Sequence, residues 1–438
     1  MTKRGTKPEA GPEEQMRRKS SVGTCCGGGC VTIVLLVLVV WLHNSAPPVV
    51  KVPPRVLPSP NAFDTFITAT KQLVDDKKIS AALSPSKKDV PVSLEEKRKL
   101  VEENRQALAT FRQGLNYEYM DVSPRSLFTQ FPYLAGYRNL ARVLSLESSI
   151  NAEEHKPAAA VNSALDAMHL GVKVPRGTIL IGELVGIACE AIGRKPLQKA
   201  VDQLSASEAK AAVNRLEKIL SEKTTFADTL TEEKYMTING LVEIFRDERN
   251  AGSLFGQTGV QDSSTMMMRA YLLLHSKQSV INNYAAYMDE NIKMHKDAFP
   301  GPCGEMKPPK DPFLSIICPV FSQADFKDQE TRAFDGLLLM QLALHAYNLD
   351  HHAYPASLNE LVGPYVKQVP ADPFALHGTL LYINKGATYV LYSVGPDGKD
   401  DRGKAIDDPS KIKDGIDRLR YYVDGQSKGD IVAGINVQ

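Results

Sequence analysis

The sequence predicts a mainly helical protein with a single N-terminal transmembrane helix and a C-terminal α+β domain, one helix packed on a small antiparallel sheet. Three observations support this fold class. An uncharged, largely apolar run stands near the start of the chain, and apolar residues recur at helical spacing between residues 61 and 297. After residue 354 the pattern changes to short strand-like segments separated by turn signals.

The apolar run at residues 23–43 is long enough to cross a bilayer once, because it holds about twenty uncharged residues. Six basic residues precede it, whereas only Lys51 and Arg55 follow within a comparable distance. The positive-inside rule then places residues 1–22 in the cytoplasm as a disordered tail, and the bulk of the protein outside the inner (cytoplasmic) membrane. The alternative is a cleaved signal peptide, with Asn44-Ser45-Ala46 as the nearest small-residue site.

The rest of the chain divides by composition into four parts. Residues 44–60 contain six prolines and are expected to form an extended linker. Residues 61–297 form the expected helical domain, residues 298–327 a proline-rich irregular linker, and residues 328–438 the C-terminal α+β domain.

Within the helical domain, capping boxes mark where two helices begin. Ser93 with Glu96 and Ser205 with Glu208 have the required spacing. The run 180–192 is apolar nearly all round and predicts a buried central helix. Residues 134–152 and 157–171 resemble one tetratricopeptide-like hairpin without a second copy at a fixed period, so a helical-repeat scaffold that binds peptides stays an alternative.

The C-terminal domain begins with a helix from about residue 328 to 350 that has an apolar stripe. A rigid corner at Tyr354-Pro355 follows, and Leu358 and Leu361 return the chain to the core through a short helical turn. A second corner at Asp372-Pro373 precedes the expected strands, which cover residues 379–383, 388–393, 418–424 and 429–435.

In this order, these motifs resemble the C-terminal domain of type II secretion system protein G, the major pseudopilin, over residues 330–410. The family's Ser-x-Gly-x-Asp-Gly loop is matched by Ser393 to Gly398. The resemblance implies that this loop binds calcium, with Val394 giving a backbone carbonyl and Asp397 a carboxylate, and that Asp407 or Asp408 is near the family's later aspartate.

Calcium prefers six to eight oxygen ligands from a flexible loop, and acidic residues abound here. The full set of expected ligands is Val394, Asp397, Asp400, Asp401, Asp407 and Asp408. The sequence departs from the family at Asp400-Asp401, where glycines are usual. A solvated turn without metal is the alternative.

The resemblance also implies a role in secretion, but this sequence departs from the family in the position of its apolar helix. Pseudopilins polymerise through an N-terminal apolar helix that is continuous with the helix of the globular domain. Here residues 44–327 separate the expected span from that helix, and the prepilin type of leader is missing. We therefore expect a reused module in a membrane-anchored protein with protein partners, related to secretion or the bacterial envelope, and not a filament subunit.

Composition and motifs narrow the remaining function classes. A net charge of +1 and an aromatic content of 7% argue against nucleic acid as a partner. No common catalytic motif occurs, so we expect no enzyme. The alternative is an enzyme whose active site lies in the helical domain, which an open cleft with coupled carboxylates such as Glu183 and Glu190 would favour.

Cys303 and Cys318 fall outside the cytoplasm in this topology and can form a disulfide there.

Overall fold

The computed structural model describes residues 47–74, 78–79, 92–246, 271, 275–296, 309, 311, 314–315, 318, 321–413 and 416–438. The chain divides into one unit of residues 1–49 and 242–282 and a second unit of residues 50–241 and 283–438. All sites considered below belong to the second unit. The expected span at residues 23–43 lies outside the described residues, and none of the helices within them has the length and apolar character needed to span a bilayer.

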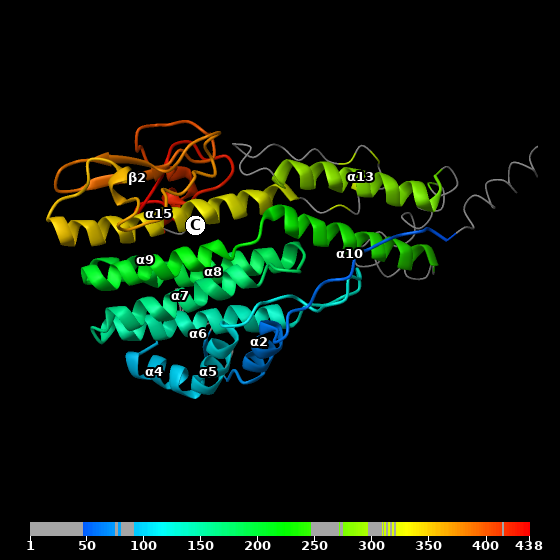
Figure 1. Ribbon diagram of the computed structural model, residues 1–438, viewed down its shortest axis with the longest axis horizontal. Helices are drawn as coiled ribbons and strands as arrows, with labels where there is room; N and C mark the ends of the chain where they lie inside the picture. Colours follow the sequence, from blue (N-terminus) through cyan, green and yellow to red (C-terminus); the bar gives the residue numbers. More distant parts are fainter. Residues whose placement is uncertain are drawn as a thin grey trace, which may run out of the picture. The chain divides into compact units, whose positions relative to one another are not determined.

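Helices make up most of the described chain, and short strands follow the last of them (Figure 1). The first helices are α2 (Ala62–Lys71), α4 (Leu94–Glu103), α5 (Arg105–Gly114), α6 (Tyr133–Glu153), α7 (Pro157–Lys173) and α8 (Leu180–Ala200). The later ones are α9 (Ala206–Ser221), α10 (Phe226–Arg246), α13 (Lys277–Lys296) and α15 (Phe321–His351). The strands are β1 (Leu381–Asn384), β2 (Tyr389–Ser393) and β3 (Ile431–Val432). The fold is thus mainly helical with a small C-terminal sheet, as the sequence predicts.

Both capping boxes are present at the start of their helices. Ser93 and Glu96 open α4, and Ser205 and Glu208 open α9, with each side chain bonded to the other residue's backbone N–H. These bonds satisfy amide groups that otherwise lack a partner in the first helical turn.

Helices α7 and α8 approach each other closely because glycines stand at their contact. A Cβ atom added to Gly171 would lie 2.5 Å from the carbonyl oxygen of Gly186, and one added to Gly193 would lie 2.6 Å from that of Ala164. The run predicted as a buried central helix is α8, which continues beyond residue 192 to Ala200. It buries Glu183 and Glu190 among its small residues.

The sheet is antiparallel in the order β1-β2-β3. Leu381 pairs with Tyr392 in the first hairpin, and Tyr392 pairs with Val432 across the second ladder. The strand predicted at 418–424 is wrong, because Asp417–Tyr421 forms a short 3-10 helix, η4. Only Ile431 and Val432 are in a strand within the predicted 429–435. Local β-propensity there does not outweigh the lack of a long neighbouring strand.

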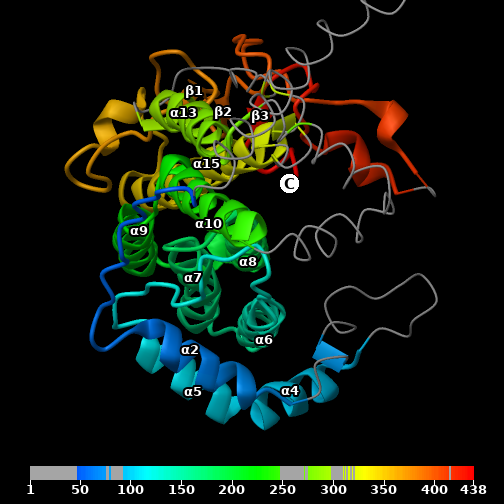
Figure 2. The same ribbon diagram turned by 90° about the vertical axis from the view of Figure 1, so that its right-hand side faces the viewer.

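The C-terminal domain shares its core with the helical domain. One apolar cluster contains Leu165 of α7, Leu216 of α9, Leu338 of α15 and Leu391 of β2. In Figures 1 and 2, α15 lies between the strands and helices α8 and α9. A second cluster joins α2, α5 and α6 around aromatic residues such as Phe66.

Helix α15 is longer than the sequence predicts and is buried nearly all round. It starts at Phe321 rather than near Asp328. Its first half carries buried acidic residues, including Asp325, Glu330 and Asp335, whereas its second half is apolar and faces the sheet and α9. The helical spacing of apolar residues predicted the second half of α15. The first half has no apolar stripe in the sequence and was therefore not predicted as helix.

Candidate functional site

The predicted calcium loop follows β2; Val394 at its start is buried, and Asp397 and Asp400 lie nearer the surface. Asp397 is half-buried and accepts a hydrogen bond from the backbone N–H of Lys399 at 3.2 Å. The Asp400 carboxylate accepts from the hydroxyl of Tyr392 at 3.1 Å and from the N–H of Arg402 at 2.8 Å. These are bonds of ordinary turns, and they leave other lone pairs of both carboxylates open to solvent.

The later aspartates have partners within the chain. The guanidinium of Arg420 binds Asp407 with two N–H groups, one of them at 2.8 Å. Asp408 accepts from the backbone N–H of Ser410 at 3.0 Å and from its hydroxyl at 2.6 Å. In this arrangement both carboxylates have hydrogen-bond donors without a metal ion.

A buried aspartate that the sequence did not single out lies beside the loop. Asp430 is fully buried and accepts hydrogen bonds from the N–H groups of Asp401 and Gly403. Burial, together with repulsion from the carboxylates of Asp400 and Asp401, raises its pKa to about 6. Sequence spacing did not reveal this aspartate, because the chain returns to the loop only after η4.

The described residues include no group of three or more His, Cys, Asp or Glu placed to hold a metal ion. The calcium site therefore stays a prediction.

The Asp-Pro corner has a structural part in this loop. The Asp372 carboxylate is buried and accepts from the hydroxyl of Ser393 at 2.7 Å and from the N–H of Val394 at 2.8 Å. A third bond comes from the N–H of Phe374. The corner thereby fixes the start of the loop, which explains why the two motifs occur together.

Of the two cysteines expected to pair, Cys303 lies outside the described residues, and Cys318 is half-buried. The disulfide stays a prediction.

Glu183 and Glu190, the carboxylates named for an enzyme site, lie in a buried polar network between α8 and α15. The ammonium group of Lys223 contacts Glu190 at 2.8 Å and Asp335 at 3.3 Å, and Arg194 contacts Asp335 at 2.8 Å. These four side chains are at most 5% exposed. Paired charges of this kind hold helices in register.

Glu183 differs from Glu190 in having no cation bonded to it. Its carboxylate accepts one hydrogen bond, from the hydroxyl of Thr229 at 2.8 Å. Burial, and then the negative charge of Asp328, raises its pKa to about 7. Both glutamates are buried. The open cleft with coupled carboxylates that would favour catalysis is therefore not found at this pair.

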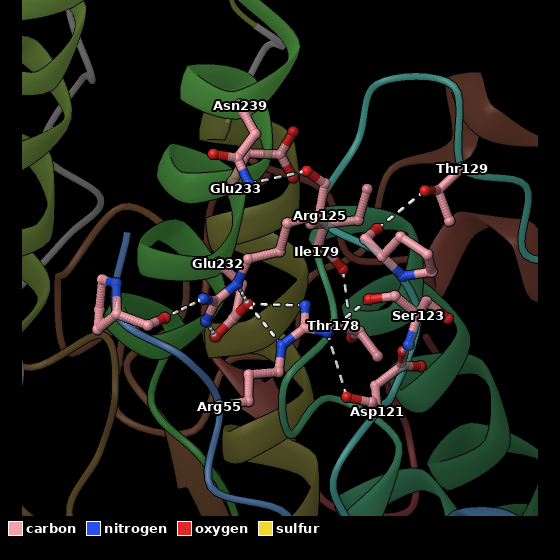
Figure 3. Close-up of polar contacts among 12 residues, drawn as sticks. Arg55, Asp121, Ser123, Arg125, Thr129, Thr178, Ile179, Glu232, Glu233 and Asn239 are labelled. Atoms are coloured by element: carbon pink, nitrogen blue, oxygen red, sulfur yellow. Dashed lines mark hydrogen bonds and ion pairs between the residues drawn. The ribbon is translucent and has the colours of Figure 1, made fainter. Parts of the chain in front are cut away.

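Two arginines clamp the proline-rich segment onto the helical domain. Figure 3 shows Arg55 and Arg125 converging on Glu232 of α10. Arg55 contacts Oε2 at 2.8 Å and Arg125 contacts Oε1 at 2.6 Å. Arg55 also donates to the carbonyl of Ser123 at 2.6 Å, and Arg125 donates to that of Pro53. The linker is therefore not a free spacer around residues 53–55.

The largest described cleft, of about 890 Å³, lies where α5, α7 and α9 end. Several of its charged side chains form ion pairs with one another. Asp166 binds both Arg112 and Arg215, while Glu222 contacts His169 and Lys173, each at 2.9 Å. Sequence reasoning missed this cleft because its residues come from three separate helices without a motif.

Comparison with known proteins supports one part of the chain. No family model matches, and no solved structure matches. The type II secretion system core protein G of Escherichia coli strain K12 is 28% identical over 102 residues, which cover 19% of this chain and 70% of that protein. The resemblance inferred from the sequence motifs is thus confirmed for about a fifth of the chain.

Proposed function

We propose that this chain is a single-span membrane protein that holds a pseudopilin-like module outside the cytoplasm and works by binding other proteins of a secretion or envelope system. Support for a binding role comes from the partial similarity to a secretion core protein and from the way the module is built into the helical domain.

The observation that carries the proposal is the burial of most of α15. Its apolar second half packs on the sheet and on α9, and its first half forms ion pairs with the helical domain, among them Asp335 with Arg194. A filament subunit needs the corresponding helix free to pack against neighbouring subunits. Here the protein's own helices already occupy that surface.

The first test concerns assembly. Full-length protein in lipid nanodiscs or detergent should appear by electron microscopy and light scattering as discrete particles, because most of the α15 surface is already covered by the protein's own helices and sheet. Filaments longer than a few subunits would contradict the proposal.

The second test concerns the partner. Leu376 is 60% exposed on the module, so a photoreactive amino acid there samples the module's surface. In the native membrane we expect covalent adducts with an envelope protein, and none with the same label at buried Leu391. A label at Leu376 that yields no protein adduct in cells actively exporting proteins would count against a binding role for the module.

The enzyme alternative rests on one observation in the largest cleft. His169 lies 2.9 Å from Glu222, and burial, outweighing the attraction of that carboxylate, lowers the pKa of His169. A neutral imidazole oriented by a carboxylate can act as a general base. Turnover of an envelope metabolite by the wild-type protein, but not by His169→Gln, would favour this alternative.

A further inference from the structure

A smaller cleft of about 340 Å³ lies between α8 and the C-terminal domain. Its floor includes Phe334 of α15, and its far wall is formed by residues 418–422 and 436–438. A volume of this size suits a small organic ligand.

The charges of this cleft are all positive. Arg194, Lys195 and Arg418 line it, and the described lining holds no Asp or Glu side chain. Arg194 is neutralised from behind by Asp335, with which it forms two hydrogen bonds. Lys195 and Arg418 are exposed, and the described part of the chain shows no ion pair for either of them.

The two exposed cations are close enough to repel each other. Partial burial, followed by the positive charge of Arg418, lowers the pKa of Lys195. In the larger cleft, by contrast, Asp166 and Glu222 lie among the cations and pair with Arg112, Arg215 and Lys173. A site that brings like charges together without a counter-charge gains most from an anionic ligand.

The remaining lining is largely apolar. Phe334 carries the Arg194 guanidinium 5.7 Å above its ring, and Ala191, Leu419 and Val437 complete the apolar surface. Val437 is 38% exposed although it is apolar. The cleft thus joins a cationic mouth to an apolar wall, as a ligand with a charged head and an apolar body requires.

We propose that this cleft binds a small organic anion. Its oxyanion head, a carboxylate, phosphate or sulfate, lies between Lys195 and Arg418, and its apolar body rests against Phe334, Leu419 and Val437. Because Lys195 belongs to α8 and Arg418 to the C-terminal domain, the ligand links the two. The inference is independent of the binding role proposed above.

Four probe ligands test separately the contributions of the anionic group and of the apolar part. Full-length protein in detergent is titrated calorimetrically with phenyl phosphate, benzoate, inorganic phosphate and benzamide. We expect phenyl phosphate and benzoate to bind, with affinity falling as salt rises, inorganic phosphate to bind at least about tenfold more weakly, and neutral benzamide not to bind. Benzamide binding as tightly as benzoate, or no binding of either aromatic anion at millimolar concentration, overturns the proposal.

Substitutions of the lining residues test whether the ligand binds in this cleft. Lys195→Gln and Arg418→Gln should each weaken phenyl phosphate binding by about tenfold or more, because each removes a charge-assisted contact. Lys199→Gln is the matched control, an exposed lysine one turn further along α8 that does not line the cleft. Lys195→Arg should keep most of the affinity. Equal binding by wild type, Lys195→Gln and Arg418→Gln would overturn the assignment, and circular dichroism checks that each variant is folded.

Discussion

At the scale of single residues, the buried carboxylates fall into two kinds. Glu190 and Asp335 share Lys223, whereas the hydroxyl of Thr229 is the hydrogen-bond donor that the described residues supply to Glu183, and Lys223 and Arg332 attract its charge without bonding to it. A carboxylate buried without a cation favours its protonated form, and its ionisation costs folding free energy.

Glu183 should therefore make the protein less stable as pH rises. Its folded pKa of about 7 lies above the unfolded value near 4.5. The stability that it contributes is complete below pH 4.5 and is lost as pH rises through 7. Glu183→Gln keeps an acceptor for Thr229 and removes this loss, so at pH 8 it should raise the free energy of unfolding by about 1–3 kcal/mol relative to wild type, and much less at pH 5.

The measurement is urea denaturation of both proteins at the two pH values. Glu290→Gln is the control, since Glu290 is exposed and should show no such pH dependence. A Glu183→Gln protein that is equally destabilised at both pH values would show that Glu183 is ionised throughout and needed as an anion.

Calcium should act on the loop after β2 through Asp397, Asp400 and Asp401, because the described bonds of Asp397 and Asp400 come from neutral donors, whereas Asp407 is paired with the Arg420 guanidinium. We predict that calcium in the range of about 10⁻⁴–10⁻³ M raises the melting temperature of the protein, as expected of weak extracytoplasmic sites. Asp397→Ala should remove the response, and Asp407→Ala should not. Identical melting in calcium and in chelator would leave the loop as a metal-free turn.

The sequence predicted residues more reliably where a motif fixed their geometry. Both capping boxes were found, because the Ser-to-Glu spacing alone brings the two groups together. Asp430 and the small cationic cleft were not found, because their parts meet only after the chain folds back. Long-range contacts of this kind leave no local periodicity in a single sequence.

At the scale of elements, glycines decide how closely α7 and α8 pack. Gly193→Ala should destabilise the protein by about 1–3 kcal/mol or more, because its Cβ would lie 2.6 Å from the backbone carbonyl of Ala164, which a side-chain movement cannot relieve. Thermal or urea unfolding measures the effect. Gly425→Ala is the matched control, where the nearest atom to a new Cβ is 3.8 Å away. Equal stability of the two variants would mean that α7 and α8 can move apart at no cost.

The arginine clamp should determine how firmly residues 50–57 are held. Glu232→Gln removes the charge shared by Arg55 and Arg125 and should speed amide hydrogen exchange in this segment by about tenfold or more, since local opening then costs less. Exchange in α7 should stay unchanged. Asp289→Asn, which removes an ion pair with Lys234 to a carboxylate 62% exposed, is the control and should have no effect on residues 50–57. Unchanged exchange in Glu232→Gln would show that the bonds of Arg55 and Arg125 to backbone carbonyls hold the segment without these ion pairs.

At the scale of the whole molecule, the change from helices to a small C-terminal sheet was predictable, but the way the two parts combine was not. The sequence suggested a boundary near residue 328, because prolines precede it and the family resemblance starts close to it. In the structure, α15 runs across that point from Phe321, and its two halves contact different partners. A helix that is buried on every side shows no amphipathic stripe, so its first half could not be assigned.

The shared core predicts that the sheet and α9 lose their structure together. Leu391 of β2 is 1% exposed and belongs to the same cluster as Leu216 of α9 and Leu338 of α15. Leu391→Ala should cost about 2–5 kcal/mol, as for other large-to-small core substitutions, and the loss should appear as faster hydrogen exchange in α9 as well as in β2. Leu376→Ala, at an exposed site in the same domain, is the control and should leave both unchanged. If Leu391→Ala opened β2 while α9 kept its full protection, the C-terminal domain would be an independent folding unit, and α15 would be bound to the helical domain without being part of its core.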